Sequence, residues 1–251
     1  MVRPKSPLRL DWVDPAVCSL DYRLKIIGRL PFFRSLPPEA VARINARFHD
    51  FDAPAESWIY HEGDPAGAVY LVATGKVKLI RHAISGREAL LDVLHGGEIF
   101  GLDGVIAGRS HQETAAAQTD CCILKISSTD FDWILQEYPA ITRNVLSVFS
   151  QRLAESQAII EQLSSFTVEQ RIAAALLRLA AKLGEARGPD VLIQLPFSRQ
   201  DLAAMTGTTP ETVSRVMSRF SDEGWIATGR KWVTLTGTRR LEELVKSGVV
   251  N

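Results

Sequence analysis

The stretch 198–226 constrains the fold of this chain most, because it reads as two short helices that meet at a glycine. Ser198 is a good N-cap for the first helix, and an acidic residue follows three positions later, as in a capping box. Gly207 separates the two helices. The second helix has Thr209 as its N-cap and Pro210 at its first position, where a missing N–H costs nothing. The sequence therefore predicts a helix, a glycine turn and a second helix.

The second of these helices separates its residues by face. Apolar residues at helical spacing predict its buried side, which holds Val213, Val216, Met217 and Phe220. A polar opposite face is typical of a helix-turn-helix, whose second helix enters the DNA major groove. Arg donates two hydrogen bonds to guanine, Glu accepts one from cytosine, and Ser bonds either way. Taken singly, each polar residue also fits a solvated helix face. The whole constellation predicts base reading by Glu211, Ser214 and Arg215.

A short β-hairpin is predicted directly after the second helix. The residues after Gly224 read IATGRKWVTLT, with a turn near Lys231. Such a wing is placed to touch the phosphate backbone, which supplies much of the affinity for DNA. We predict that the phosphate-contacting residues are Arg199, Thr208, Thr212, Arg219 and Lys231.

The segment 210–215, PETVSR, follows Gly207 and precedes the predicted wing, and it resembles the Crp/Fnr family of transcription regulators. The Glu-x-x-Ser-Arg spacing is similar to the Fnr branch more than to the cyclic-AMP receptor protein branch. In the latter, Arg usually precedes the Glu and Gly usually precedes the later Arg, whereas Pro210 and Ser214 stand here. The resemblance extends over about residues 28 to 246. It implies a homodimeric regulator that binds a palindromic, TTGA-like operator.

The fold class that follows is α+β. The parts expected are an N-terminal double-stranded β-roll, similar to cyclic-nucleotide-binding domains, a long dimerisation helix and a C-terminal winged helix-turn-helix. Between Phe51 and Ser127, short β-rich runs alternate with glycine-containing turns, as in a small β-roll. The predicted parts are an arm at 1–20, an effector-sensing β-roll at 21–138, a dimerisation helix at 139–166 and a DNA-binding domain at 167–251.

Several boundaries follow from local patterns. Helices are predicted over 21–33, 37–48, 128–138, 168–183 and 238–246. A loop is predicted over 184–189 and a strand over 191–195. The glycines at 63, 75, 86, 97 and 101 are predicted to occupy turns that need a positive φ or close strand approach.

An apolar stripe runs along the predicted long helix in alternating steps of three and four. Such a stripe is typical of a coiled-coil seam. Packing of the stripe on its own β-roll is the alternative, and the residues alone leave the two interpretations even. The family resemblance favours a dimer seam formed by Leu146, Phe149, Leu153, Ser156, Ile160 and Leu163.

The effector pocket is predicted from the resemblance. Cyclic-nucleotide binders of the family grip the ribose with a Gly-Glu pair, and roughly ten residues later an Arg-Ser pair cradles the phosphate. Here Leu102 follows Gly101, and Arg109-Ser110 comes about three residues early. Glu113 near a cyclic phosphate would repel it. The candidate pocket is Gly101, Leu102, Arg109 and Ser110, and cyclic AMP is disfavoured as its ligand. A cyclic-nucleotide-dependent regulator stays as the alternative, followed by a ligand-binding module without DNA function.

The cofactor is open at this point. An iron–sulfur cluster usually takes four Cys thiolates, whereas this chain has Cys18, Cys121 and Cys122. The last two are neighbours on a predicted strand, so their side chains point to opposite faces. We therefore predict no cluster of the Fnr kind, no zinc site and no disulfide framework. Haem held by a β-roll His and a thiol switch at Cys18 stay open.

No sequence motif indicates catalysis. The chain lacks Gly-x-x-x-x-Gly-Lys, His-Glu-x-x-His and Gly-x-Ser-x-Gly, so we predict that it is not an enzyme. No run of about 18 apolar residues predicts a membrane helix, and the N-terminus does not read as a signal peptide. We expect a cytoplasmic activator or repressor without a membrane partner. Its expected partners are double-stranded DNA, RNA polymerase, a second copy of the chain and a small-molecule effector.

Overall fold

The computed structural model describes residues 19–34, 36–82, 88–194, 198–236 and 238–247. These residues divide into two compact units, which part between Ala154 and Glu155 inside a long helix. Each unit is described by itself. The predicted N-terminal arm falls on residues 1–18, outside the described residues, apart from Ser19 and Leu20, which cap and begin the first helix.

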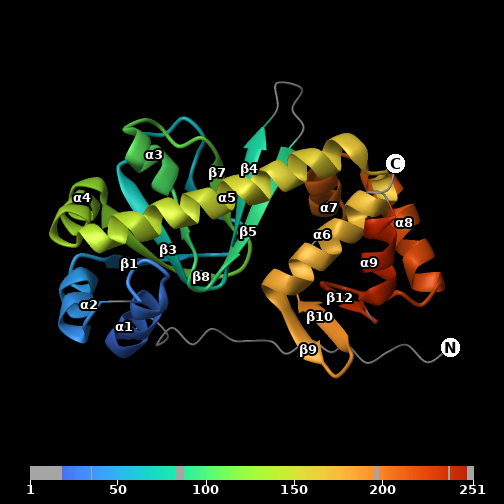
Figure 1. The fold of residues 1–251 in the computed structure, drawn as a ribbon, viewed down its shortest axis with the longest axis horizontal. Coiled ribbons are helices and arrows are strands. Elements are labelled where there is room, and N and C mark those ends of the chain that lie inside the picture. The colour runs from blue at the N-terminus through green and yellow to red at the C-terminus, as the bar shows by residue number, and fades with distance from the viewer. Residues whose placement is uncertain (1–18, 35, 83–87, 195–197, 237, 248–251) are drawn as a thin grey trace. The chain divides into compact units, whose positions relative to one another are not determined.

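Two four-stranded antiparallel sheets build the N-terminal unit (Figure 1). The first sheet has the order β1 (His49–Ala53), β8 (Cys121–Ser127), β3 (Ala68–Thr74) and β6 (Ile99–Phe100). The second has the order β2 (Trp58–Tyr60), β7 (Thr114–Ala117), β4 (Lys76–His82) and β5 (Glu88–His95). Apart from the consecutive strands β4 and β5, neighbours in each sheet come from distant parts of the chain. The predicted β-roll is confirmed.

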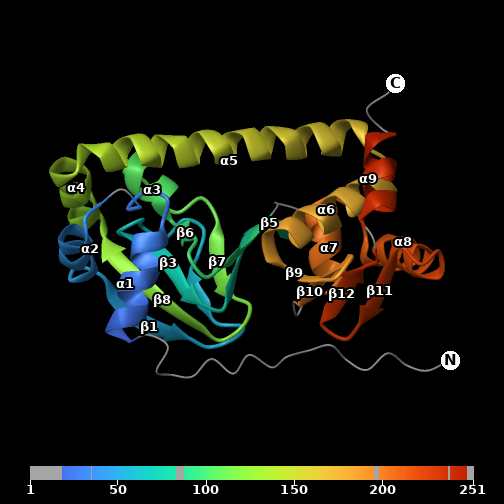
Figure 2. The same cartoon turned by 60° about the horizontal axis from the view of Figure 1, so that its bottom comes forward.

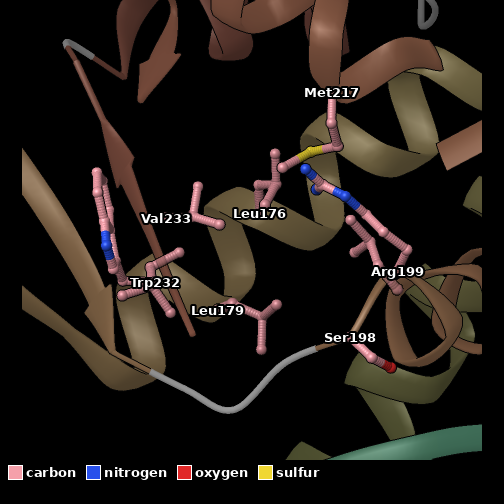
Figure 3. A pocket seen from close by; sticks show the side chains of 9 residues that line it. Leu176, Leu179, Ser198, Arg199, Met217, Trp232 and Val233 are labelled. Atoms are coloured by element: carbon pink, nitrogen blue, oxygen red, sulfur yellow. The ribbon is translucent and has the colours of Figure 1, made fainter. Parts of the chain in front are cut away.

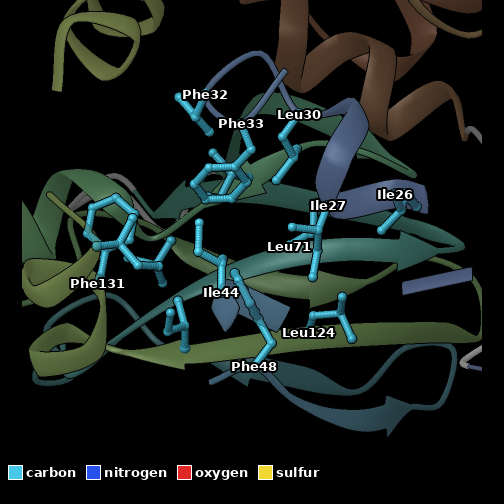
Figure 4. Packing of buried hydrophobic residues seen from close by; sticks show 14 of the residues in the cluster. Ile26, Ile27, Leu30, Phe32, Phe33, Ile44, Phe48, Leu71, Leu124 and Phe131 are labelled. Carbon is cyan, nitrogen blue, oxygen red and sulfur yellow. The ribbon is translucent and has the colours of Figure 1, made fainter. Parts of the chain in front are cut away.

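Helices cover the outer face of the first sheet. They are α1 (Leu20–Arg29), α2 (Pro38–Asn45), α3 (Leu102–Ala107), α4 (Ser128–Glu137) and the start of α5 (Pro139–Ser165). Figure 4 shows Ile27 of α1 and Ile44 of α2 near Leu71 of the sheet, and Phe131 of α4 belongs to the same cluster. We call this packing the outer core. Full burial of each such side chain stabilises the fold by about 1.5–3 kcal/mol.

Some predicted helix boundaries are wrong in this unit. The helix predicted over 21–33 ends at Arg29, because Leu30 takes an extended ψ of 138° and turns follow. The helix predicted over 37–48 ends at Asn45, and β1 begins at His49. The short helix α3 was not predicted. It begins after Gly101, whose φ of +69° few side chains adopt.

The strand alternation divides the buried residues between two cores. Leu71 and Leu124 face the outer core, whereas their neighbours Val72 and Ile123 face the space between the two sheets. We call the second set the inner core. Val77 and Phe100 also belong to it, so both sheets contribute. The two sheets are therefore held face to face by apolar burial.

Positive φ angles confirm most of the predicted turn glycines. Gly63, Gly75, Gly97 and Gly101 have φ between +69° and +92°, and Gly86 lies outside the described residues. At position 75 space is limiting as well. A Cβ there would lie 2.4 Å from the carbonyl oxygen of Asp120, so only glycine allows this approach.

The C-terminal unit combines the end of α5 with a helical bundle and a second kind of sheet. Its helices are α6 (Val168–Leu183), α7 (Arg199–Thr206), α8 (Pro210–Asp222) and α9 (Arg239–Lys246). Its antiparallel sheet has the order β11 (Ile226–Gly229), β12 (Trp232–Leu235), β10 (Asp190–Gln194) and β9 (Gly184–Arg187). Figure 2 shows these strands gathered beside α6. The winged helix-turn-helix is confirmed.

The loop predicted over 184–189 is wrong. Residues 184–187 form β9, which pairs with β10 across a turn at Gly188, where φ is +65°. Its Glu185 and Arg187 are exposed, so the strand carries little of the apolar alternation that predicts strands. None of the helices in the described ranges has the length and apolar character needed to cross a membrane.

Candidate nucleic-acid interface

Side-chain caps fix where the two helices of the interface begin, and the cap of α7 is reciprocal. The Ser198 backbone N–H donates to Asp201 Oδ2 at 2.8 Å, and the Asp201 N–H donates to Ser198 Oγ at 3.0 Å. Thr209 Oγ1 accepts from the Thr212 N–H at 3.3 Å at the start of α8. Both caps satisfy donors that a helix start leaves free. The predicted beginnings of α7 and α8 are therefore confirmed.

The turn between the helices depends on glycine. Gly207 has φ +61° and ψ 41°, and the following Thr208 N–H donates to the Ala203 carbonyl at 3.1 Å. This left-handed C-cap reverses the chain within a few residues. A Cβ at position 207 would also come 3.4 Å from Leu163 Cδ2 of α5. Gly207 thus sets the angle of α8 and brings the turn close to the end of α5.

The two faces of α8 separate as predicted. Its four predicted apolar residues are all at most 4% exposed, which anchors the helix to α6 and α7. Glu211, Ser214 and Arg215 are exposed on the other face. Among the described residues, Arg215 has no hydrogen-bond or ion-pair partner. Its guanidinium is therefore available for an outside acceptor.

The carboxylate of Glu211 stands at the positive end of α8. Hydrogen bonds from its own backbone N–H and from Thr209 hold the pKa of Glu211 below its ordinary value. The free N–H groups and the dipole at a helix N-terminus also favour a negative charge there. Glu211 is thus ionised near neutral pH and can accept a hydrogen bond from a base amino group.

The predicted phosphate-contacting residues have different surroundings. Lys231 is exposed at the tip of the β11–β12 hairpin, with φ +67°. Thr208 and Thr212 are partly exposed beside the turn, and Thr212 Oγ1 lies 3.2 Å from Thr209 Oγ1. The tight tip needs Gly229, because a Cβ there would meet the Trp232 indole at 2.3 Å.

Arg199 is more buried than a simple phosphate contact would be. Figure 3 shows its side chain extending toward Met217 along a small pocket between α6, α7 and β12. The cavity has a volume of about 30 Å³, and Leu176 and Trp232 also line it. Burial lowers the pKa of Arg199, although a guanidinium stays charged.

Arg219 is held by an acidic partner that the sequence did not reveal. Its Nη1 lies 2.5 Å from Glu169 Oε1 of α6, and its Nε lies 3.8 Å from Glu223 Oε1. This ion pair raises the pKa of Arg219. Glu169 stands fifty positions before Arg219, so no local spacing in the sequence links them. The predicted phosphate contact of Arg219 has to compete with this ion pair.

The apolar stripe of α5 is largely open. Leu146, Leu153 and Ile160 are 61–64% exposed, and Leu163 is 43% exposed. Ser156 is exposed between them. Phe149 differs, because it is partly buried against the outer core of its own unit. The stripe therefore has five exposed positions and one partly buried position.

The four residues predicted for the effector pocket do not line the space between the sheets together. Gly101 is buried there, next to His111 and Tyr70. The side chain of Leu102 belongs to the outer core. Arg109 is exposed and Ser110 is partly exposed.

A different set of side chains fills that space, which sequence reasoning missed as a group. We call it the inner cluster, and it consists of Tyr60, Tyr70, Phe100, His111 and Glu113. The polar run at 111–113 directly before the apolar strand β7 was the available signal. None of these five side chains offers a fixed positive charge to an anionic phosphate, since burial lowers the pKa of His111.

The cysteines lie in two different cores. Cys121 faces the inner core and Cys122 the outer core, and both are 5% exposed. Cys122 is disulfide-bonded, which the sequence reasoning did not anticipate, and Cys121 carries a free thiol. Cys18 lies outside the described residues. Within the described ranges, no three His, Cys, Asp or Glu side chains are grouped to hold a metal ion.

Comparisons with known proteins agree with this architecture. Residues 51–138 match the cyclic nucleotide-binding domain family, and residues 170–244 match the Crp-like helix-turn-helix domain family. The chain is 33% identical over 214 residues to the Cyclic AMP receptor protein of Thermus thermophilus, covering 85% of this chain and 96% of that protein. It is 26% identical over 217 residues to the CRP-like cAMP-activated global transcriptional regulator of Mycobacterium tuberculosis, covering 86% and 97%.

Two solved structures are similar as well. FixK2 from Bradyrhizobium japonicum has a TM-score of 0.71 at 27% identity, covering 78% of this chain and 96% of that one. The c-di-GMP responsive regulator CLP from Xanthomonas campestris has a TM-score of 0.70 at 25% identity, covering 80% and 100%.

Proposed function

The chain belongs to the Crp/Fnr family of transcription regulators, and we propose that it binds a palindromic TTGA-type operator as a homodimer. The observation that carries this proposal is the polar face of α8. That face projects an ionised Glu211, Ser214 and an unpaired Arg215 away from a fully buried apolar face.

Each reading residue has a base that suits its chemistry. Arg215 donates two hydrogen bonds to the guanine of the half-site, and Glu211 accepts one from the paired cytosine. Ser214 lies against the neighbouring thymine. The similarity of Glu-x-x-Ser-Arg to the Fnr branch supports this order along the half-site.

Phosphate contacts surround the reading helix. Lys231 on the wing, Thr208 and Thr212 beside the turn, and Arg199 and Arg219 on the helices are the proposed set. Such contacts position a protein on DNA without reading its sequence. Lys231 of the wing is expected to contribute equally to the affinity for every DNA sequence, because it is exposed and no described residue pairs with it.

The dimer forms along α5. Large apolar side chains seldom gather exposed in steps of three and four unless a partner covers them. A two-fold axis along this stripe presents two reading helices to successive major grooves, about 34 Å apart. The proposed parts are a β-roll at 21–138, the dimerisation helix at 139–166 and the DNA-binding domain at 167–251, acting together in the cytoplasm, where the DNA is.

Regulation is proposed to arise in the β-roll. An effector of the β-roll changes the affinity of the dimer for its operator, and the bound dimer contacts or obstructs RNA polymerase. Membership of a regulator family supports a role without catalysis.

The stoichiometry of the DNA complex tests this proposal. Multi-angle light scattering of the protein with one inverted-repeat duplex should give two chains per duplex. A duplex that carries a single half-site should bind far more weakly, because the second half-site raises the effective concentration of the second reading helix. One chain per inverted repeat at saturation would contradict the proposal.

A cyclic-AMP-dependent regulator is the second candidate. The name of the Thermus thermophilus relative favours it. The buried Glu113 and the stacked, neutral His111 oppose it, since neither offers positive charge to a cyclic phosphate. Titration calorimetry decides between them. A dissociation constant below about 10 μM, which corresponds to about 7 kcal/mol, would establish cyclic AMP as a ligand.

The cofactor is addressed by the absorption spectrum of anaerobically purified protein. We propose that no iron–sulfur cluster is bound, because Cys121 and Cys122 face different cores and cannot share one metal. Stoichiometric iron with labile sulfide would overturn this, and an intense Soret band would favour haem.

A further inference from the structure

One buried carboxyl group has no part in the proposed DNA interface. Glu113 is 7% exposed and lies directly before β7. Its Oε1 accepts a hydrogen bond of 2.7 Å from the Tyr60 hydroxyl. A buried carboxylate is costly unless a charge or several hydrogen bonds compensate it, and a single neutral phenol compensates only in part. The surroundings therefore favour the protonated form of Glu113.

Aromatic rings make the surroundings of Glu113 weakly polar. The Tyr60 ring stacks on His111 with 3.7 Å between centroids and 11° between planes. Tyr70 and Phe100 lie 5.4 and 5.9 Å from the same ring. His111 is 2% exposed, and its Nδ1 has no hydrogen-bond partner among the described residues. Charge effects are stronger in such a place than in water.

Charged groups face Glu113 from several elements. Burial raises the pKa of Glu113, and the Tyr60 hydrogen bond opposes this in part. The carboxylate of Asp103 on α3 raises the pKa further, whereas the guanidinium groups of Arg152 on α5 and Arg81 on β4 lower it. The result is a carboxyl group that releases its proton above the ordinary glutamate range.

Arg152 connects this carboxyl group to the long helix. Its Nη2 donates to the Ile99 carbonyl of β6 at 2.5 Å. Ile99 precedes Phe100 of the inner cluster, and Arg152 precedes Leu153 in the middle of the exposed stripe. One guanidinium is thus tied to β6 and also attracted by Glu113 when Glu113 is ionised.

We propose that Glu113 is a proton-operated switch in the β-roll and that Arg152 transmits its charge to α5. The proposal rests on the proposed function, because it makes proton binding a signal that changes affinity for DNA. When Glu113 releases its proton to solvent, the new negative charge competes with the Ile99 carbonyl for Arg152. The hydrogen bond that joins α5 to β6 then weakens, and the position of the apolar stripe of α5 relative to the β-roll changes with it.

The first test measures operator affinity by fluorescence anisotropy between about pH 5.5 and 8, across the range above the ordinary glutamate value. A difference of one pKa unit between the free and DNA-bound protein corresponds to about a ten-fold change in affinity. We expect a change of this size in the wild type and in Glu39→Gln, the same substitution at an exposed site on α2. Glu113→Gln should lose it. An unchanged pH profile in Glu113→Gln would overturn the proposal.

The second test separates proton binding from its transmission. Arg152→Met should keep the pH dependence of the urea unfolding midpoint that Glu113→Gln loses, while its DNA affinity no longer follows pH. Arg152→Met with the full pH dependence of DNA affinity would overturn the role of Arg152. If no variant binds any inverted repeat, the proposed function fails. The unfolding midpoints of wild type and Glu113→Gln then still show whether Glu113 titrates.

Discussion

Arg219 of the reading helix α8 lies 2.5 Å from Glu169 of α6, measured between Nη1 and Oε1. Arg215, one helical turn earlier on the same exposed face, has no such partner among the described residues. Two arginines that look equivalent in the sequence therefore have different surroundings. Arg215 is free to donate to a base, whereas Arg219 forms an ion pair with α6 of its own domain.

Arg215 should govern the choice of the guanine. Arg215→Ala removes a two-bond contact, so we expect a loss of about 1–3 kcal/mol in binding free energy, confined to the guanine position. Arg215→Lys should lose discrimination as well, because an ammonium cannot make the paired contact. Anisotropy titrations with duplexes that differ at this one base pair measure the effect.

Lys231→Ala is the matched control for Arg215→Ala. It should weaken binding to every duplex alike and reduce the salt dependence by about one ion, as expected for a phosphate contact. Discrimination at the guanine that survives Arg215→Ala would mean that another residue reads it.

The ion pair between Glu169 and Arg219 should weaken DNA binding. Glu169→Gln removes the charge that pairs with Arg219, so affinity for all DNA sequences should rise, with a steeper salt dependence. The pair should add less than about 1 kcal/mol to stability, because both side chains are about 40% exposed to solvent. A double-mutant cycle of Glu169→Gln and Arg219→Ala, measured by urea unfolding, gives the contribution of the ion pair to stability. Weaker DNA binding in Glu169→Gln would show that the ion pair assists the DNA contact.

Leu153 should be essential for dimerisation. Leu153→Glu places a charge in the middle of the stripe, where a dimer would bury it at a cost of several kcal/mol. Light scattering should show monomers, and operator affinity should fall sharply because the half-sites are no longer held together. Ala158→Glu is the control, since it adds the same charge on the opposite, exposed side of α5. A Leu153→Glu protein that stays dimeric would point to another interface.

His111 should make the fold sensitive to acid. Burial lowers the pKa of His111, and the nearby Asp103 and Asp64 oppose this only in part. The folded state therefore binds fewer protons than the unfolded state. Stability is then fully present above the ordinary histidine value, about 6.5, and is lost as the pH falls through the lowered pKa.

His111→Phe keeps an aromatic ring against Tyr60 and removes the titration. We expect the urea midpoint of the wild type to fall more than that of His111→Phe between about pH 7.5 and 5.5. Because each protein is compared with itself at two pH values, a change in packing caused by the substitution does not affect the result. Equal losses in the two proteins would exclude His111 as the titrating group.

Local patterns accounted for the parts of the structure whose causes are local. The capping residues Ser198 and Thr209 and the apolar spacing of α8 marked the helix-turn-helix almost to the residue. Pro139 marked the start of α5, whose predicted end at position 166 lies one residue beyond the observed end at Ser165. Each of these signals acts within a few positions of the chain.

The features that escaped sequence reasoning depend on contacts between distant segments. Glu169 and Arg219 meet only because α6 packs against α8. Tyr60 and Glu113 meet because β2 pairs with β7. The strand β9 forms because it pairs with β10. The inner cluster was missed for the same reason, and Leu102 of the predicted pocket packs in the outer core.

The central claim is that two copies of this chain read a palindrome with Arg215 and Glu211. Selection of bound duplexes from a random library, followed by sequencing, tests it most directly. The account predicts an inverted repeat of TTGA half-sites whose centres are about 10 base pairs apart, one turn of B-DNA. The guanine of each half-site should become variable when Arg215→Ala is used in the same selection. Recovery of unrelated single sites, or of no sequence preference at all, would contradict the account.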